Sequence, residues 1–193
     1  MPSRFASKLT SLGFAMPEWC LPSSERLVRE YEGRFALSLP TDYREFLVHH
    51  GGVVGSAECA FQEQTPCGNA TCVESFYGFT RSDRHDDIAR ATEMIEGAPD
   101  VVAIADNLMG AMFWMKCSGR DRGYVYMHDH EGRFAWPDEE FYVRFGNLSP
   151  TIKDYLILRK RGGLPEKPRG YEHVYRLATS FGEFIERLEK AEE

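Results

Sequence analysis

Cysteine and histidine are the residue types in this chain best suited to metal binding or nucleophilic chemistry, and three cysteines lie close together. Cys59, Cys67 and Cys72 fall within fourteen residues. Zinc sites usually combine two ligand pairs, each spaced by two to four residues. Cys67 and Cys72 have four residues between them, and no second pair matches them. The other candidate ligands are Cys117, His128 and His130. We therefore interpret the cysteines as scattered free thiols, with a metal site as the alternative interpretation.

Two further constellations have simpler structural explanations. In the segment MHDHEGR, His128 and His130 would share one face of a strand while Asp129 points the other way, and the composition is typical of a hydrated hairpin turn. Asp83 and Asp87 are spaced i, i+4, but they fall in the first turn of a predicted helix, where acidic side chains favour the helix dipole. The sequence contains no nucleophile elbow, phosphate-binding glycine loop or H-E-x-x-H motif. We expect no catalytic residues, no metal and no cofactor.

The formal net charge of −7 is concentrated in the middle of the chain. Residues 1–82 carry seven Lys or Arg against nine Asp or Glu, residues 83–140 carry six against thirteen, and residues 141–193 carry ten against eight. An acidic surface repels a phosphate backbone and attracts a basic protein. We therefore expect a protein partner and no direct contact with nucleic acid.

Helices are predicted near both ends of the chain. Ser23 or Ser24 can cap a first helix that ends at Gly33, and Pro40 opens a second helix that Gly51 terminates. Three further helices are predicted over 81–95, over 151–160 after the pair Ser149-Pro150, and from Ser180 onward with a capping box to Glu183.

Between the helical segments the sequence changes to short aromatic and β-branched runs. Strands are predicted at 75–79, 101–105, 111–117, 123–127, 133–136 and 141–145. Most of the connections are too short for parallel crossovers, so neighbouring strands should be antiparallel. Two segments, 55–72 and the loop 161–173, are expected to leave the core. The predicted fold class is α+β in a single domain over 1–193, with N-terminal helices, a central mainly antiparallel sheet of about five to six strands, and C-terminal helices packed on the sheet.

The sequence also indicates a cellular compartment. No stretch reaches the ~20 apolar residues of a membrane span. The first residues, MPSRFASKLTSLGFAMPEW, are interrupted by Gly13 and Pro17 and do not form the apolar core of a signal peptide. An odd number of cysteines without a regular framework fits a reducing environment. We expect a cytoplasmic protein with no membrane contact.

The segment ERLVREYEGRFALSLPTDYREFLVHHGG resembles the N-terminal signature of the SUKH superfamily, the Smi/Knr-type domains. The matching residues are Leu27, Glu32, Leu39, Pro40, Asp42, Tyr43, Phe46, Leu47, Gly51 and Gly52. The family usually has Asn before the double glycine, where this chain has His50. Further matches follow in order: FYGF at 76–79, the run from VVAIADNLMG to MHDHEGR, and the closing LATSFGEFIERLE. The resemblance covers about 24–189.

This resemblance implies a binding module without catalytic residues. Bacterial members are mostly regarded as immunity proteins, which neutralise polymorphic or contact-dependent toxins, often nucleases or deaminases, by direct binding. Because nuclease toxins present basic clefts, we hypothesise that the acidic middle third faces the toxin, with nearby aromatic residues as anchors. The candidate partner-binding residues are Asp83, Asp86, Asp87, Asp106, Asp129, Glu131 and Trp136.

Two other functions remain as alternatives. Fungal members of the superfamily act as regulatory scaffolds, so this chain could be an intracellular scaffold without a toxin partner. The third reading is a small metal-dependent enzyme that uses the cysteine and histidine cluster.

Overall fold

The structure is a computed structural model that describes residues 3–21, 23–81, 84, 87–95 and 100–191. Over these residues it contains seven α-helices, one 3-10 helix and six strands. The helices are α1 (Ala6–Ser11), α2 (Glu25–Phe35), α3 (Thr41–His50), α4 (Ile88–Glu93), η1 (Arg133–Ala135), α5 (Asp138–Phe145), α6 (Pro150–Lys160) and α7 (Phe181–Arg187). The strands are β1 (Val53–Ala60), β2 (Ala70–Phe76), β3 (Val101–Asp106), β4 (Met112–Lys116), β5 (Val125–His128) and β6 (Val174–Ala178).

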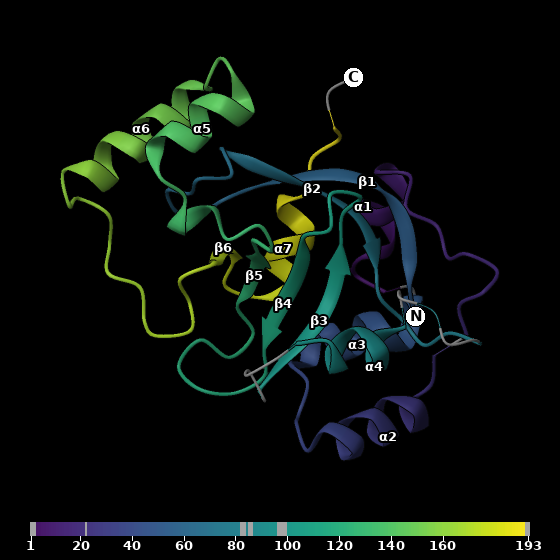
Figure 1. The fold of residues 1–193 in the computed structure, drawn as a ribbon. Coiled ribbons are helices and arrows are strands. Elements are labelled where there is room, and N and C mark those ends of the chain that lie inside the picture. The colour runs from purple at the N-terminus through teal and green to yellow at the C-terminus, as the bar shows by residue number, and fades with distance from the viewer. Residues whose placement is uncertain (1–2, 22, 82–83, 85–86, 96–99, 192–193) are drawn as a thin grey trace.

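The six strands form one sheet in the order of the sequence, and each neighbouring pair is antiparallel. Figure 1 shows that the sheet curls, and α7 contacts both edge strands, β1 and β6. The Gln62 amide, which follows β1, donates a hydrogen bond to the Arg176 carbonyl of β6 at 2.9 Å, so the two edges meet. The predicted α+β class, with helices at both ends of the chain and an antiparallel sheet, is therefore confirmed.

An aromatic cluster fills the inside of the curl. The ring of Phe46 in α3 lies 5.6 Å from that of Phe76 in β2 and 5.0 Å from that of Phe181 in α7. Phe184 of α7 adds a contact to Phe113 of β4, with ring centroids 6.0 Å apart. All five side chains are buried. Fully burying a side chain of this size contributes roughly 1.5–3 kcal/mol, so this cluster holds the helices to the sheet.

Three of the predicted helix starts are confirmed by capping hydrogen bonds. The side-chain oxygens of Ser24, Ser149 and Ser180 accept from the backbone N–H groups three residues further on, and Pro150 occupies the first turn of α6. The predicted end of α2 at Gly33 is wrong. The helix continues to Phe35, and Ala36 takes the left-handed conformation that ends it, with φ of 51°.

Two predicted strands are wrong because helix signals outweigh strand propensity there. Residues 133–136 contain η1, and residues 141–145 lie in α5. Pro137 and the acidic first turn of α5 favour a helix start, and this local preference overrides the aromatic run that follows. Figure 1 shows α5 and α6 set apart from α2, α3 and α4. The buried residues of these helices and of the segment between them form a second, smaller hydrophobic cluster: Phe141, Leu148, Ile152, Tyr155 and Leu156.

Half of the segment 55–72, which was expected to leave the core, belongs to the sheet. Its ends lie in β1 and β2, and only 61–69 lies outside both strands. The last strand, β6, was not predicted, and the helix predicted over 81–95 is confined to α4 among the described residues. The loop 161–173 contains no helix or strand, as expected.

The double glycine after α3 packs directly on a third glycine. Gly51 ends α3 with φ of 64°. A Cβ atom built on Gly78 would lie 2.2 Å from the Gly52 nitrogen and 2.7 Å from the Gly51 carbonyl carbon. Neither backbone segment can yield to a side chain at these distances. Two parts of the sequence signature, HHGG and FYGF, therefore contact each other in the structure through these glycines.

We predict that Gly78→Ala destabilises the protein by about 3 kcal/mol or more, because the added methyl group overlaps backbone atoms in a packed interior. Gly33→Ala is the matched control. Gly33 lies exposed in α2 with no atom within 4 Å of a built Cβ, so alanine should stabilise by about 0.5–1 kcal/mol. Urea unfolding measures both free energies, and equal unfolding midpoints for the two variants would contradict the prediction.

Candidate functional site

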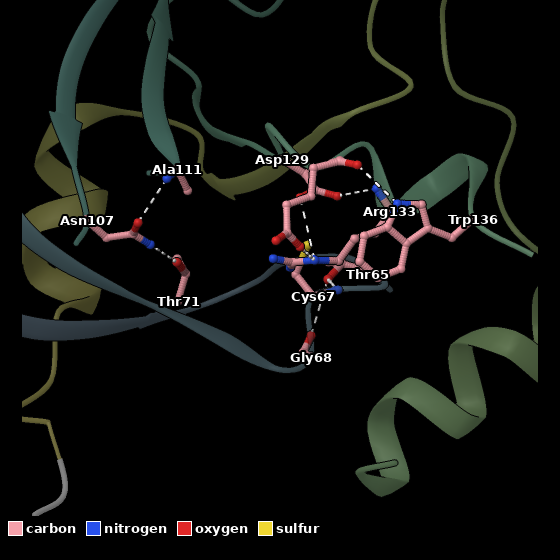
Figure 2. A network of polar contacts seen from close by, with 10 residues as sticks. Thr65, Cys67, Gly68, Thr71, Asn107, Ala111, Asp129, Arg133 and Trp136 are labelled. Carbon is pink, nitrogen blue, oxygen red and sulfur yellow. Dashed lines mark hydrogen bonds and ion pairs between the residues drawn. The ribbon is translucent and has the colours of Figure 1, made fainter. Parts of the chain in front are cut away.

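Two segments that follow strand ends lie side by side at one end of the sheet. The β3–β4 turn joins Asp106 to Met112, and Met112 pairs with His128, the last residue of β5. A Cβ atom on Gly110 would lie 3.3 Å from His130 Nε2, so the turn contacts the segment that leaves β5. Asn107 Oδ1 accepts hydrogen bonds from the amides of Met109 (3.0 Å) and Ala111 (2.9 Å), which fixes the turn; Figure 2 shows the bond from Ala111.

A buried ion pair holds the segment after β5. Asp129 is 2% exposed, and its amide donates to the His173 carbonyl at 2.8 Å. Asp129 Oδ2 accepts from the Arg133 amide at 2.8 Å, and Arg133 Nε lies 3.8 Å from Asp129 Oδ1. Figure 2 shows Arg133 beside Asp129, and Arg133 Nε also donates to Glu131 Oε2 at 2.7 Å. Although burial opposes the charge, Cys67, Asp129 and Glu131 together hold the pKa of Arg133 above its usual value.

The same segment positions Trp136. The indole Nε1 donates to the Glu131 carbonyl at 3.1 Å. The ring of Trp136 stacks on Phe145 of α5 with centroids 6.3 Å apart, and the Arg144 guanidinium lies 4.5 Å from the indole centroid. The side chain is half-buried against the α5–α6 cluster. Trp136 therefore connects the end of the sheet to α5.

The structure brings together only some of the predicted partner-binding residues. Asp106, Asp129, Glu131 and Trp136 lie at this end of the sheet, but Asp129 is buried and Asp106 accepts a hydrogen bond from the Tyr77 hydroxyl at 3.0 Å. Asp87 lies elsewhere, where it caps α4 and accepts from the Ala89 and Thr80 amides, each at 3.0 Å. Asp83 and Asp86 lie outside the described residues.

Apolar side chains at this site were missed by the sequence analysis. Leu108 and Met109 in the β3–β4 turn are 90% and 74% exposed, and Val143 of α5 is 84% exposed. Tyr142 and Phe145 of α5 are also exposed. An eight-residue helix that buries only Phe141 while showing three large apolar residues is unusual for a surface helix. The sequence did contain a signal for the helix that carries three of them: Pro137 followed by three acidic residues at 138–140 is typical of a helix start, but the segment was assigned as a strand.

We group these five apolar residues with two of the predicted partner-binding residues, Glu131 and Trp136, and call the group the exposed face. It consists of Leu108, Met109, Glu131, Trp136, Tyr142, Val143 and Phe145. Contacts join part of it: Gly110 of the turn lies against His130, the neighbour of Glu131, the Glu131 carbonyl binds the Trp136 indole, and Trp136 stacks on Phe145.

Two of the cysteines approach this site, and burial lowers the reactivity of one of them, Cys67. Cys67 and Cys72 line a cavity of about 230 Å³ together with Asp129, His130 and Arg133. Burial raises the pKa of the Cys67 thiol to about 12, and burial likewise raises the pKa values of Cys59 to about 11 and Cys117 to about 12. Metal ligation and nucleophilic attack need the thiolate.

The predicted histidine pair is separated. His128 lies in β5 with its ring stacked on Trp114 at 4.5 Å, and burial lowers its pKa, whereas His130 is exposed beside Gly110. Among the described residues, no group of three or more His, Cys, Asp or Glu side chains is arranged to hold a metal ion. No helix in the described part of the chain is both long and apolar enough to cross a membrane.

We predict that Cys59, Cys67 and Cys117 react with iodoacetamide at pH 7.5 at least ~100-fold more slowly in the folded protein than in urea. Their pKa values are raised by burial, so below these values each thiol stays protonated, and unfolding restores the thiolate fraction. Peptide mass spectrometry after timed labelling measures each site. Native labelling of Cys67 at the unfolded rate would contradict the prediction and favour a reactive thiol at this site.

Comparison with known proteins supports the resemblance seen in the sequence. The model of the SMI1 / KNR4 family (SUKH-1) matches residues 22–187. None of the curated proteins searched matches the chain. The matched region extends from the residues before α2 to the end of α7, and it includes both halves of the glycine contact, the Asp129–Arg133 pair and the exposed face. The chain belongs to the SMI1/KNR4 (SUKH-1) family.

Proposed function

We propose that this protein is a non-catalytic immunity protein that binds a cognate toxin domain, a nuclease or a deaminase, and neutralises it by covering its working surface. Membership of the SUKH-1 family supports this proposal, because immunity is the role known for SUKH proteins. The exposed face is the observation that carries it for this chain. It offers large apolar side chains at the surface of a molecule whose main core is already filled.

The composition of the exposed face fits protein recognition. Interface energy is concentrated in a few aromatic and apolar anchors that lose contact with water on binding. Trp136, Tyr142 and Phe145 supply aromatic anchors, and they belong to or directly precede one short helix. Trp136 is held by the Glu131 carbonyl and its ring contacts, so little conformational freedom is lost when a partner covers it.

Charge supports a basic partner. Residues 129–145 carry five acidic side chains against two basic ones, and they lie beside or within the exposed face. Several of these acids form ion pairs within the chain, such as Glu140 with Arg144, but the net charge of the region stays negative. A basic nuclease cleft would be attracted to this region at long range and would associate faster as a result.

The partner-binding residues predicted from the sequence have different roles in this proposal. Glu131 and Trp136 belong to the exposed face, whereas Asp129 acts as the buried anchor that holds both in place. Asp87 and Asp106 contribute to local structure through their hydrogen bonds. Asp83 and Asp86 remain proposed contributors to the acidic field.

We expect Val143→Asp to weaken binding to the proposed cognate toxin by at least about tenfold, since it places a charge within a desolvated apolar contact. Met94→Asp is the matched control, because Met94 is a similarly exposed apolar residue that follows α4, outside the exposed face. Surface plasmon resonance gives both dissociation constants, and survival of cells expressing the toxin gives the functional result.

Two outcomes would contradict the proposal. The first is a wild-type protein that neither binds the toxin nor protects cells from it, which would favour the regulatory scaffold. The second is equal loss of binding in both variants, which would remove the exposed face as the contact surface.

A further inference from the structure

A cavity of about 230 Å³ lies beside the exposed face. It is lined by three segments of the chain, 67–72, 107–111 and 127–133. Figure 2 shows Thr71 and Asn107 on one side of it and Asp129 and Arg133 on the other. Met109, which is 74% exposed, belongs both to this lining and to the exposed face. A partner that covers the exposed face therefore also reaches this cavity.

The shape and lining of the cavity suit one long, flexible side chain. Met109, Ala111 and Met127 supply apolar surface. Methionine side chains are flexible and adapt to the group that packs on them. A volume of about 230 Å³ equals that of about eight water molecules at ~30 Å³ each, which is enough for an aliphatic chain with a polar end. A whole helix or loop of a partner is too large for it.

One oxygen of the buried Asp129 carboxylate has no hydrogen-bond donor. Asp129 lines the cavity and is 2% exposed. Its Oδ2 accepts the Arg133 amide at 2.8 Å, but Arg133 Nε lies 3.8 Å from Oδ1, too far for a hydrogen bond, and donates to Glu131 instead. Among the described residues, Oδ1 accepts no hydrogen bond. Burying a carboxylate oxygen without a donor is costly, so this atom favours a ligand that supplies one.

Acidic side chains outnumber basic ones around the cavity. Asp129 and Glu131 share the single guanidinium of Arg133, which leaves one negative charge uncompensated. Glu74 adds a further carboxylate, because it accepts the Leu108 amide in the β3–β4 turn. The cavity therefore attracts a cation.

Basic side chains near the cavity do not reverse this charge. The three lining segments contain no Lys or Arg besides Arg133. Arg144 of α5 also acts on Glu131, but its Nε lies 3.4 Å from Glu140 Oε1, so its charge is compensated within α5.

We propose that this cavity receives a lysine side chain of the partner protein. The four-carbon stem packs on Met109 and Met127, and the ammonium group donates to Asp129 Oδ1. Lysine fits better than arginine, because a guanidinium is best bound by two acceptors in one plane and Asp129 offers one free oxygen. The identity of the partner rests on the proposed function, whereas the chemistry of the cavity does not. In a nuclease, a lysine held here is withdrawn from phosphate binding.

The chemistry of the cavity can be measured without a toxin, by NMR titration of the whole chain at pH 7.5 and constant ionic strength. Blocked lysine should bind with a dissociation constant of about 20 mM or below and shift the amides of Ala111 and Arg133. Blocked norleucine has the same four-carbon stem without the ammonium group, and it should bind at least about fivefold more weakly. Blocked arginine should bind at least about twofold more weakly than lysine.

A variant of the chain tests whether the toxin uses the cavity. Cys72 is half-buried in the lining, so Cys72→Lys places an ammonium group of the chain itself there. It should abolish binding of blocked lysine and weaken binding of the proposed cognate toxin by at least about tenfold. Ser38→Lys is the matched control, since it adds the same charge to an exposed residue between α2 and α3, and it should change toxin binding by less than about twofold. If Cys72→Lys does not fold by circular dichroism, the three blocked amino acids still decide on the wild-type chain.

Failure of this inference differs from failure of the proposed function. The lysine site is overturned if blocked lysine does not bind at about 100 mM, if norleucine or arginine binds as tightly, or if folded Cys72→Lys binds lysine or the toxin like the wild type. If blocked lysine binds as expected but the wild-type chain neither binds a toxin nor protects cells, the lysine site is supported and the proposed function is overturned.

Discussion

The backbone of Gly78 lies against the backbone of Gly51 and Gly52 so closely that no side chain fits between them, and the arrangement of the core depends on this contact. It joins the end of α3 to the segment after β2. With α3 held there, Phe46 reaches Phe76 and Phe181, and α7 contacts both edges of the curled sheet. The glycines of the family signature are therefore explained by packing, since a Cβ at either crossing point would separate helix from sheet.

A second interaction, the buried contact between Asp129 and Arg133, connects the sheet to the exposed face. The Asp129 carboxylate is buried at the end of β5, and its bonds to Arg133, together with those of Arg133 to Glu131, fix the segment that leads to Trp136 and α5. Removing one partner of a buried ion pair costs far more than the pair contributes, so this arrangement specifies one conformation of the segment. The face can then present apolar side chains without depending on the main core for their position.

The sequence predicted those features that local chemistry decides. Serine caps, the terminating Gly51 and the aromatic strands β3 to β5 each have a signal within a few residues. The features that were predicted wrongly depend instead on neighbouring segments or on tertiary packing. FYVRF has the composition of a strand, yet Pro137 and three acidic residues start a helix there, and β1 pairs through a run of small residues with little strand propensity. Asp129 looked like a surface turn residue because its burial depends on His173, far along the chain. Exposure of Val143 likewise follows from tertiary packing that no local pattern contains.

We propose that a rigid α+β frame presents one preformed face to a toxin. Hydrogen exchange of the protein, alone and in complex with its proposed cognate toxin, tests this most directly. The account predicts that the toxin slows exchange in the β3–β4 turn and α5 and leaves the amides of α3 and β2 unchanged. Protection centred on α2 and α4, with no change in α5, would contradict it.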